Sequence, residues 1–121
     1  LLARIRLPRI WPDLKHYYRK VGTRKAQAIS KVCFAATARV NEGTIEQVRI
    51  ALGSVAPVPL RCLKTEEVLR GATLDENSIE SARTALAREI VPINDIRSTR
   101  DYRLRVSLNV LEDFLRQLAV S

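Results

Sequence analysis

The chain has 121 residues, of which 46% are hydrophobic and 28% are charged, and its formal net charge is +8. A chain of this length forms one domain with a sizeable core, and it contains no apolar run of the roughly 18 residues that a membrane-spanning helix needs. The two cysteines, Cys33 and Cys62, exclude a disulfide framework, and the single histidine, His16, excludes a His-based metal cluster and a Ser/His/Asp triad. With no targeting segment visible, we expect a cytoplasmic protein without a membrane span or a metal site.

The positive charge is concentrated near the beginning of the chain. Residues 1–25 carry eight lysines and arginines against one acid, Asp13, whereas the other 96 residues carry 13 basic and 12 acidic groups. Such asymmetry indicates that the N-terminal segment faces an anionic partner. One hypothesis is a nucleic-acid-binding module, but few aromatic side chains accompany the charges and no nucleic-acid-binding motif is present. The alternative is a segment that meets an anion, or another domain, within a larger protein.

The first residues have the pattern of a strand that ends and a linker that follows it. The chain begins without methionine, and residues 2–7 alternate in polarity. Pro8 and Pro12 then interrupt both helix and central strand. We therefore predict that residues 1–13 are the end strand and linker of a missing upstream domain, and that the domain proper covers residues 14–121.

The next segments predict an edge strand and a hairpin. Residues 16–21 are aromatic, basic and β-branched, which favours a short edge strand, and the Ala-rich residues 25–30 are enough for one helical turn. Residues 31–40 alternate with one fully apolar face and a second nearly so, which predicts a strand that is central or covered on both faces. The turn signal at residues 41–44 joins it to a partner strand over residues 45–53.

The same alternation assigns side chains to faces of the hairpin. Val48, Ile50 and Leu52 are predicted to point inward, and Arg49 is predicted to point outward. Cys33 lies within the first apolar strand, where a free thiol is most often buried and inert. We therefore expect Cys33 to belong to the core.

The segment after the hairpin predicts a crossing and a short helix. Residues 54–61 contain two prolines two positions apart, so they are predicted to be an extended crossing segment rather than a central strand. A short helix then begins with Thr65 as its N-cap and ends just before Gly71. The acids in its first turn, Glu66 and Glu67, are interpreted as favourable partners of the helix dipole.

Two longer helices complete the chain. The second helix follows an N-cap at Asp75 or Asn77, and the third opens at Ser98 with a capping-box-like sequence. Leucines recur at spacings of four and three over residues 104–118, and the apolar face is wide enough to lie flat on a sheet. Strands followed by helices predict an α+β fold, with an antiparallel sheet of three to four strands covered by about three helices.

Three sequence blocks occur in the order of a known family. The first, over residues 18–24, is Tyr-x-Lys followed by x-x-x-Arg. The second joins residues 56–61 to residues 67–71 and is similar to a Pro-x-Arg segment with a downstream Glu-x-x-Leu-x-Gly. The third, over residues 92–103, resembles a closing Asp-x-Arg-x-Ser and Tyr-Arg signature. Together they resemble the C-terminal domain of the FAD-binding (medium) subunit of molybdenum hydroxylases, the xanthine dehydrogenase and CO dehydrogenase flavoprotein family.

The resemblance implies a function within a larger complex. Such a subunit carries FAD and passes electrons from iron–sulfur clusters, which a molybdenum centre feeds, to an acceptor. This domain would help to close the flavin pocket and to dock partner subunits, while upstream FAD-binding domains hold most of the cofactor. The molybdenum cofactor and the iron–sulfur clusters would lie on partner subunits only. We therefore expect the chain alone to be non-catalytic and to bind FAD weakly or not at all.

Candidate site residues follow from the resemblance by position. Lys20 and Arg24 are the best candidates for flavin-side contacts, and Tyr18 comes next. The alternative for these residues is a set of rim salt bridges to the missing domains. The closing signature is assigned a structural role, an Asp-Arg lock at the crossing of the last two helices, and its residues are Asp95, Arg97, Tyr102 and Arg103.

Overall fold

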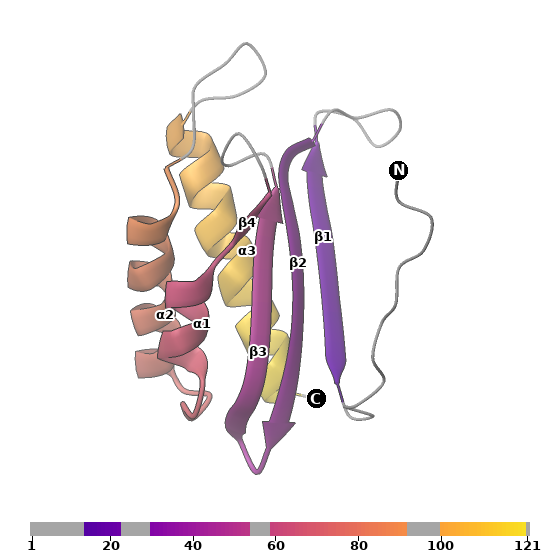
Figure 1. Ribbon diagram of the computed structural model, residues 1–121, viewed down its shortest axis with the longest axis vertical. Helices are drawn as coiled ribbons and strands as arrows, with labels where there is room; N and C mark the ends of the chain where they lie inside the picture. Colours follow the sequence, from indigo (N-terminus) through magenta and orange to yellow (C-terminus); the bar gives the residue numbers. More distant parts are fainter. Residues whose placement is uncertain (1–13, 23–29, 54–58, 92–99, 121) are drawn as a thin grey trace.

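In the part of the chain that the computed structural model describes, residues 14–22, 30–53, 59–91 and 100–120, the strands form one antiparallel sheet. The strand order is β1-β2-β3-β4, and the elements are β1 (Lys15–Gly22), β2 (Ser30–Asn41), β3 (Thr44–Gly53), β4 (Leu60–Arg61), α1 (Leu63–Leu69), α2 (Glu76–Glu89) and α3 (Arg100–Val120). Strands come first and helices second (Figure 1), which confirms the predicted α+β class. The predictions for residues 1–13, 25–29, 54–58 and 98–99 lie outside the described residues.

A tight hairpin joins β2 to β3. Asn41 faces Thr44 across the end of the two strands, and the residues between them, Glu42 and Gly43, have positive φ angles of 52° and 77°. Two-residue hairpin loops favour positive φ because their twist then matches that of the strands, and glycine adopts it without strain. The predicted hairpin is confirmed, with its turn at the predicted place.

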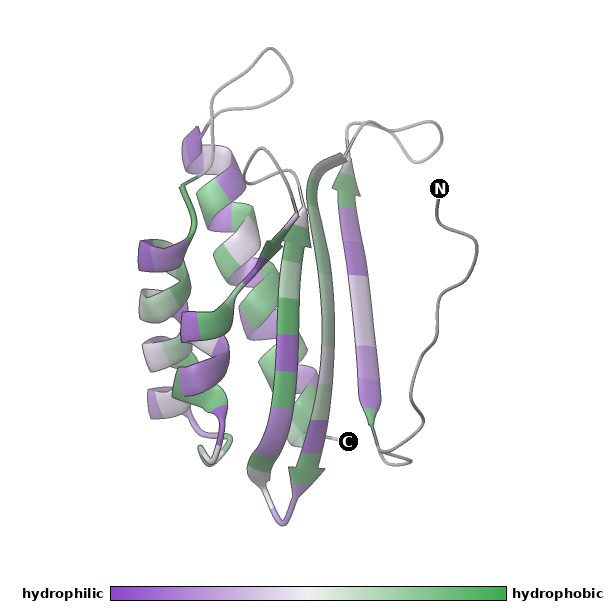
Figure 2. Cartoon of the chain, viewed as in Figure 1, coloured by the Kyte–Doolittle hydropathy of each residue, from purple (hydrophilic) through white to green (hydrophobic). Residues whose placement is uncertain are grey.

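The inward side chains of the hairpin form the floor of the core. They alternate with polar or small outward side chains, and the bands along β3 show this pattern of hydropathy (Figure 2). The buried residues that these strands contribute are Val32, Phe34, Ala36, Ala38, Ile45, Val48, Ile50 and Leu52. The predicted inward face of the second hairpin strand is confirmed.

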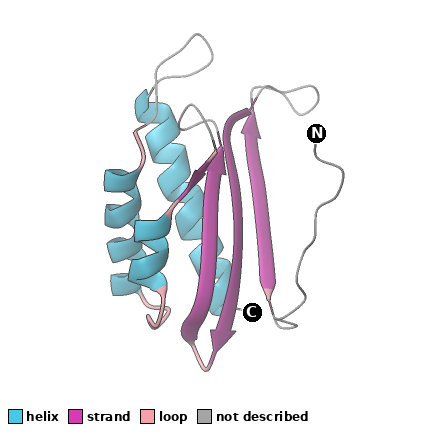
Figure 3. Ribbon diagram, viewed as in Figure 1, coloured by secondary structure: helices cyan, strands magenta, loops and turns pink. Residues whose placement is uncertain are grey.

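The strand β2 is central, as predicted, but the described helices cover only its inner face. Figure 3 shows these helices gathered as a layer against the sheet. On the opposite face Ala35 is exposed and Cys33 is half-buried. The prediction that Cys33 belongs to the core is therefore wrong, because small side chains on an outward face can be apolar without being covered. The fully buried thiol is Cys62.

An aromatic cluster attaches the edge strand β1 to the rest of the domain. The ring of Tyr17 lies 5.6 Å from that of Phe34 and 5.5 Å from that of Phe114, between ring centroids. The Tyr17 hydroxyl donates a hydrogen bond of 2.7 Å to Asp113 Oδ2 in α3. Burial, with the Asp113 hydrogen bond, raises the pKa of Tyr17. The predicted edge strand is thus confirmed and is held by both packing and a polar contact.

The short helix α1 begins earlier than the sequence predicts and is capped by another helix. Its N-cap residue is Cys62, without a side-chain cap, and Thr65 lies buried inside the helix. The carboxylate of Glu89 in α2 accepts hydrogen bonds from the backbone nitrogens of Lys64 (2.9 Å) and Thr65 (3.0 Å) and from Thr65 Oγ1 (2.8 Å). The prediction of Thr65 as N-cap is therefore wrong, because Glu89 satisfies the N–H groups that a cap would satisfy. Gly71, with φ of 80°, follows the helix as predicted.

The second helix matches its prediction closely. Asp75 is its N-cap, and Asp75 Oδ1 accepts a hydrogen bond of 2.8 Å from the backbone nitrogen of Ser78. Ile79, Ala82 and Leu86 are buried at the predicted spacings of three and four. One apolar stripe therefore faces the core and the opposite side faces solvent.

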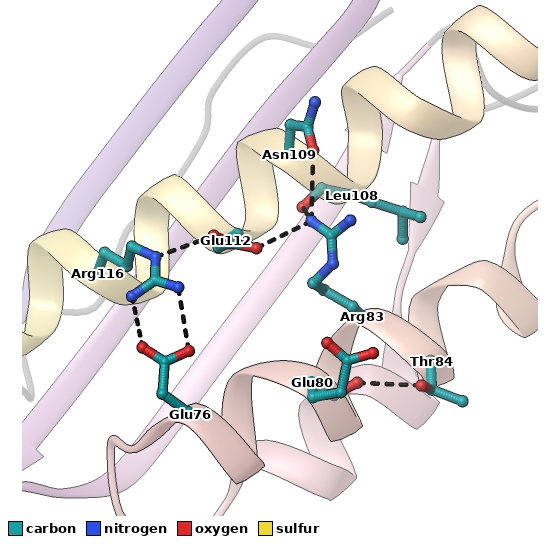
Figure 4. Close-up of polar contacts among 8 residues, drawn as sticks. All are labelled: Glu76, Glu80, Arg83, Thr84, Leu108, Asn109, Glu112 and Arg116. Atoms are coloured by element: carbon teal, nitrogen blue, oxygen red, sulfur yellow. Dashed lines mark hydrogen bonds and ion pairs between the residues drawn. The ribbon is translucent and has the colours of Figure 1, made fainter.

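Arginine–carboxylate contacts set how α2 lies against α3 (Figure 4). Arg116 of α3 donates to both carboxylate oxygens of Glu76 (2.8 and 3.1 Å) and to Glu112 (2.9 Å). Arg83 of α2 donates to the carbonyl oxygen of Leu108 (3.0 Å) and lies 3.1 Å from Glu112. The hydrogen bonds from Arg116 lower the pKa of Glu76. Because these side chains are partly or largely exposed, the network orients the helices more than it stabilises them.

The longest helix covers β2 and β1, while α1 covers β3. Apolar side chains of α3 are buried over several turns of the helix. They are Val110, Leu111, Phe114, Leu115 and Leu118. Leu104 and Leu108 are partly buried. The predicted broad apolar face is confirmed. None of the described helices is both long enough and apolar enough to span a bilayer.

Replacing a core leucine of α3 tests this packing. Leu111 is fully buried, so Leu111→Ala should lower the free energy of unfolding by about 2–5 kcal/mol, the usual result of deleting a buried leucine. Val120→Ala is the control on the same helix, because Val120 is 87% exposed, and it should change stability by less than about 0.5 kcal/mol. Urea unfolding measures both variants. Equal stability of the two would mean that α3 does not cover the sheet.

Candidate functional site

The face of the sheet that points away from the helices is here called the outer face. Every second side chain of β1, β2 and β3 points there, and the antiparallel register aligns these side chains in rows across the strands. The rows are, in order along the sheet, His16, Thr37 and Arg49; Tyr18, Ala35, Ala51 and Arg61; and Lys20, Cys33 and Gly53. The outer face is defined by these residues.

A groove of about 760 Å³ lies over the first two rows of the outer face. Ala35, Thr37 and Ala51 line it with small side chains, and Tyr18 and Arg49 line it with larger ones. No carboxylate is found among the described residues that line it. The groove therefore combines a small, partly apolar floor with positive charge, which suits a flat or apolar surface that bears an anion.

Two of the three predicted site residues lie on the outer face. Tyr18 is 67% exposed, and Lys20 is exposed two residues further along β1. The negative charge of the ionised Cys33 thiolate would raise the pKa of Tyr18, with smaller contributions in the same direction from desolvation and from a hydrogen bond to Cys33. Arg24 lies outside the described residues, so its place at the site stays a prediction.

A buried carboxylate holds Arg61 at this face. Glu66 of α1 is fully buried and accepts hydrogen bonds from Arg61 Nε (3.0 Å), from Arg61 Nη2 (2.9 Å) and from the backbone nitrogen of Ile50 (3.0 Å). The hydrogen bond to Glu66 raises the pKa of Arg61. Glu66 lies in the first turn of α1, as its interpretation as a partner of the helix dipole requires, but its carboxylate also binds Arg61 and the backbone of β3. Its neighbour Glu67 is exposed.

This contact explains the second sequence block. The predicted start of its second half, at residue 67, is wrong by one position, because the spacing Glu-x-x-Leu-x-Gly is met by Glu66, Leu69 and Gly71. Arg61 is the arginine of the Pro-x-Arg segment. Leu69 is fully buried, and Gly71 has the positive φ that follows the helix. The two halves of the block therefore pair with each other, and their role is to fix α1 and β4 on β3.

The closing sequence block is described only in part. Asp95 and Arg97 lie outside the described residues, so the predicted Asp-Arg lock stays a prediction. Arg103, at the end of the first turn of α3, is only 2% exposed, and Tyr102 is half-buried. Burial of Arg103 within the helical layer agrees with a structural role for this block.

Sequence reasoning missed most of the outer face. It assigned Arg49 correctly to an outward position but gave it no role, and it did not single out Arg61 or the small residues Ala35 and Ala51. The available signal was the alternation itself, since Ala35 and Ala51 occupy outward positions where exposed strands usually carry longer polar side chains. The described residues also contain no group of three or more His, Cys, Asp or Glu side chains placed to hold a metal ion.

Comparison with known families identifies the domain. The profile of the CO dehydrogenase flavoprotein C-terminal domain matches residues 16–118. The chain belongs to this family. The match extends over all the described strands and helices, from β1 into the last turn of α3. It confirms the resemblance of the three sequence blocks, and it gives no support to a nucleic-acid-binding module.

Relatives of this flavoprotein domain are parts of longer chains. The chain is 29% identical over 87 residues to the putative xanthine dehydrogenase FAD-binding subunit of Escherichia coli (strain K12). The aligned region covers 72% of this chain and 30% of that protein. It is 28% identical over 107 residues to the glyceraldehyde dehydrogenase medium chain of Sulfolobus acidocaldarius. This aligned region covers 88% of this chain and 37% of that protein. The chain thus spans about a third of the length of these relatives.

Solved structures agree with this assignment. Carbon monoxide dehydrogenase from Hydrogenophaga pseudoflava superimposes with a TM-score of 0.80 at 26% identity, over 88% of this chain and 37% of that chain. Quinoline 2-oxidoreductase from Pseudomonas putida 86 superimposes with a TM-score of 0.77 at 25% identity, over 89% of this chain and 38% of that chain. The fold is therefore that of the CO dehydrogenase flavoprotein C-terminal domain.

The paired acids of α1 allow a matched test of the buried carboxylate. Glu66→Ala should lower the free energy of unfolding by more than about 2 kcal/mol, because it leaves the Ile50 N–H without its acceptor and removes the partner of Arg61. Glu67→Ala, one position away and exposed, should change it by less than about 0.5 kcal/mol. Urea unfolding at neutral pH compares them. If the two variants were equally stable, Glu66 would be a surface acid.

The buried thiol gives a pH-dependent prediction. Burial, followed by the charges of Glu89 and Glu66, raises the pKa of Cys62 from 9.0 to about 12. The folded state therefore prefers the protonated thiol, so this contribution to stability is complete below pH 9 and is lost as the pH rises toward 12. Between pH 8 and pH 10 the wild type should lose about 1 kcal/mol more of unfolding free energy than Cys62→Ala. Parallel losses in urea unfolding would show that Cys62 ionises freely in the folded state.

Proposed function

We propose that this chain is the C-terminal domain of the FAD-binding subunit of a xanthine dehydrogenase-like molybdenum hydroxylase. The single observation that carries the proposal is the family match over residues 16–118. A relative described as a xanthine dehydrogenase FAD-binding subunit supports it. In this function the domain is not catalytic by itself. It helps to close the flavin pocket, whose larger part the upstream FAD-binding domains form.

The outer face fits the flavin side of such a pocket. Lys20 and Tyr18 are both exposed there, and the neighbouring positions Ala35, Ala51 and Gly53 carry only small groups, which leave room for a planar ring. FAD, when bound, accepts and passes on electrons, and a nearby positive charge tunes how readily it does so. Lys20 would supply that charge, Tyr18 would supply an aromatic wall with a hydroxyl group, and Arg24 would add a second cation.

Electron transfer defines the partners of the proposed subunit. Iron–sulfur and molybdenum subunits of the same complex would carry the iron–sulfur clusters and the molybdenum cofactor, and the electrons would pass from the clusters to FAD. One structural relative is described as a carbon monoxide dehydrogenase that lacks the Mo-pyranopterin moiety of the molybdenum cofactor. The cytoplasmic location and the weak binding of FAD by the chain alone stay predictions.

Removing the Lys20 charge tests the proposal in the FAD-binding subunit that contains this domain. Lys20→Ala should lower the flavin reduction potential by about 20 mV, because a cation near the flavin favours the negatively charged reduced form and an exposed charge is worth up to about 1 kcal/mol. Lys64→Ala removes an exposed lysine from α1, in the helical layer, and should leave the potential unchanged. Spectroelectrochemical titration of both variants measures the effect.

The same variants separate a flavin contact from a structural one. Flavin content and melting temperature are recorded beside the potential. Unchanged flavin content and potential, together with a lower melting temperature in Lys20→Ala alone, would assign Lys20 to a rim contact and remove it from the flavin side.

A further inference from the structure

Large apolar side chains are exposed where α1 meets the end of α2. Single exposed apolar residues are ordinary on a protein surface, but three of the five large ones exposed among the described residues belong to this one place. These three are Leu63, Val68 and Val91, whose exposed fractions are 58%, 41% and 70%. The other two, Tyr18 and Val120, lie on β1 and in the last turn of α3. A group of exposed apolar side chains marks a binding surface rather than a solvated one.

A contact between the two helices brings Leu63 and Val91 to the same end of the helix pair. The helices lie side by side (Figure 1), and the Glu89 carboxylate at the end of α2 accepts a hydrogen bond of 2.9 Å from the backbone nitrogen of Lys64. Leu63 directly precedes Lys64, and Val91 follows Glu89 by two residues. The last turn of α2 adds an exposed arginine to this end. The α1–α2 patch comprises Leu63, Val68, Arg88 and Val91.

Arg88 is the cation of the patch whose charge no neighbouring acid balances. It is exposed, and no hydrogen bond or ion pair joins it to another described residue. The adjacent Glu89 accepts three hydrogen bonds at the start of α1, and the buried Glu66 holds two arginines, at 2.9 and 4.0 Å. Lys64 and Glu67 lie three residues apart on the exposed side of α1, where their charges offset each other. A carboxylate from outside the domain therefore complements Arg88.

We propose that the α1–α2 patch binds a separate protein chain of the complex, through a surface on which a carboxylate is set among apolar side chains. The carboxylate pairs with Arg88, and the apolar side chains cover Leu63, Val68 and Val91. Apolar contacts around a specific charge pair are a usual composition of protein–protein interfaces. The inference rests on the proposed function, which supplies other chains that bind the FAD-binding subunit. It adds which surface of the domain such a chain occupies and which chemistry recognises it.

The place of the patch in the fold favours another chain over two alternative occupants. The patch belongs to the helical layer, whereas Tyr18 and Lys20 lie on the outer face, on the other side of the sheet (Figure 3). A body that holds the flavin against the outer face therefore lies away from α1 and α2. A second copy of this chain, related by a twofold axis, would place the Arg88 of each copy against a patch of the same charge. The occupant is thus acidic where this domain is cationic.

Hydroxyl-radical footprinting tests whether the patch is covered, because a side chain that is shielded from solvent is oxidised more slowly. The assembled complex is compared with the FAD-binding subunit alone, and mass spectrometry reads each peptide. Leu63 and Val91 should be oxidised at least about fivefold more slowly in the complex, as side chains at the centre of an interface are. Val120 is the matched control, since it is 87% exposed on α3, and its rate should change less than about twofold. Equal rates for Leu63 and Val91 in the two samples, or equal protection of Val120, would overturn the proposal.

Carbodiimide cross-linking of the Arg88→Lys variant identifies the occupant. The substitution keeps the positive charge and supplies an amine. The reagent joins this amine to a carboxylate in direct contact, forming an amide, and the carbodiimide takes up the water that is lost. In the complex we expect a cross-link from this position to an aspartate or glutamate of another chain. A cross-link to the flavin-binding part of the same chain or to a second copy would overturn the proposal, as would a set of products identical to that of the subunit alone.

Two further variants measure how much the patch contributes to assembly. Leu63→Asp places a charge among the apolar side chains, and Arg88→Glu sets an acid against the partner's carboxylate. Each should weaken binding of the FAD-binding subunit to the remaining subunits at least about tenfold in isothermal titration. Val120→Asp is the control for an exposed valine changed to an acid, and it should stay within about twofold of the wild type. Binding as tight as that of Val120→Asp would overturn the proposal. If either variant lowers the melting temperature of the subunit, footprinting of the wild type decides.

Failure of the proposed function is recognised separately. FAD content and the effect of Lys20→Ala on the potential test the flavin role, whereas the oxidation of Leu63 and Val91 does not depend on the flavin. A subunit without FAD whose patch is protected by other chains would reject the proposed function and retain the docking surface. A subunit with FAD that responds to Lys20→Ala, but whose patch is oxidised equally in the complex and alone, would do the reverse.

Discussion

The buried carboxylate of Glu66 is the contact on which the arrangement of the domain depends. It joins three elements at one point, because it accepts hydrogen bonds from the backbone of β3 and from the guanidinium group of Arg61 in β4 while belonging to α1. The helix α2 packs on α1, while α3 packs both on α2 and directly on β2 and β1. Glu89 of α2 caps the start of α1, and Arg116 of α3 binds Glu76 of α2. A carboxylate buried beneath the sheet thus fixes α1 and the edge of the outer face where Arg61 lies.

The fold could be predicted from periodicity wherever one face of an element is buried. The hairpin turn, the inward residues of β3 and the cap of α2 at Asp75 followed from alternation, from helical spacing and from local hydrogen-bonding chemistry. Predictions were wrong where the decisive group comes from elsewhere in the chain. Thr65 looks like an N-cap in isolation, but Glu89, 24 residues away, takes that role. Likewise Glu66 cannot be told from Glu67 until the position of β3 is known.

The candidate site shows the same division. Tyr18 and Lys20 were found by resemblance, and strand geometry then required them to share a face because they are two residues apart. Arg49 and Arg61 were not found, since an exposed arginine in a strand has no local sequence signature that separates it from a solubilising charge. The misassignment of Cys33 has a related cause. Apolarity predicts burial only when something covers the face, and the described helices cover just the other one.

The adjacent tyrosines of β1 point to opposite faces of the sheet: Tyr17 faces the helices and Tyr18 faces away from them. The same alternation determines which charged side chains the outer face displays. Tyr17 packs against both Phe34 and Phe114 and is hydrogen-bonded to Asp113, while Tyr18 faces the groove. If β1 slid by one residue along β2, the two rings would exchange places almost isosterically, but Lys20 would turn toward the core. Either tyrosine could donate to Asp113, so this hydrogen bond does not decide the register; the alternation that places Val21 against the core and exposes Lys20 decides it. The alternation of apolar and charged side chains along β1 therefore determines which charges the outer face displays, on the far side of the sheet from the half-buried Asp113.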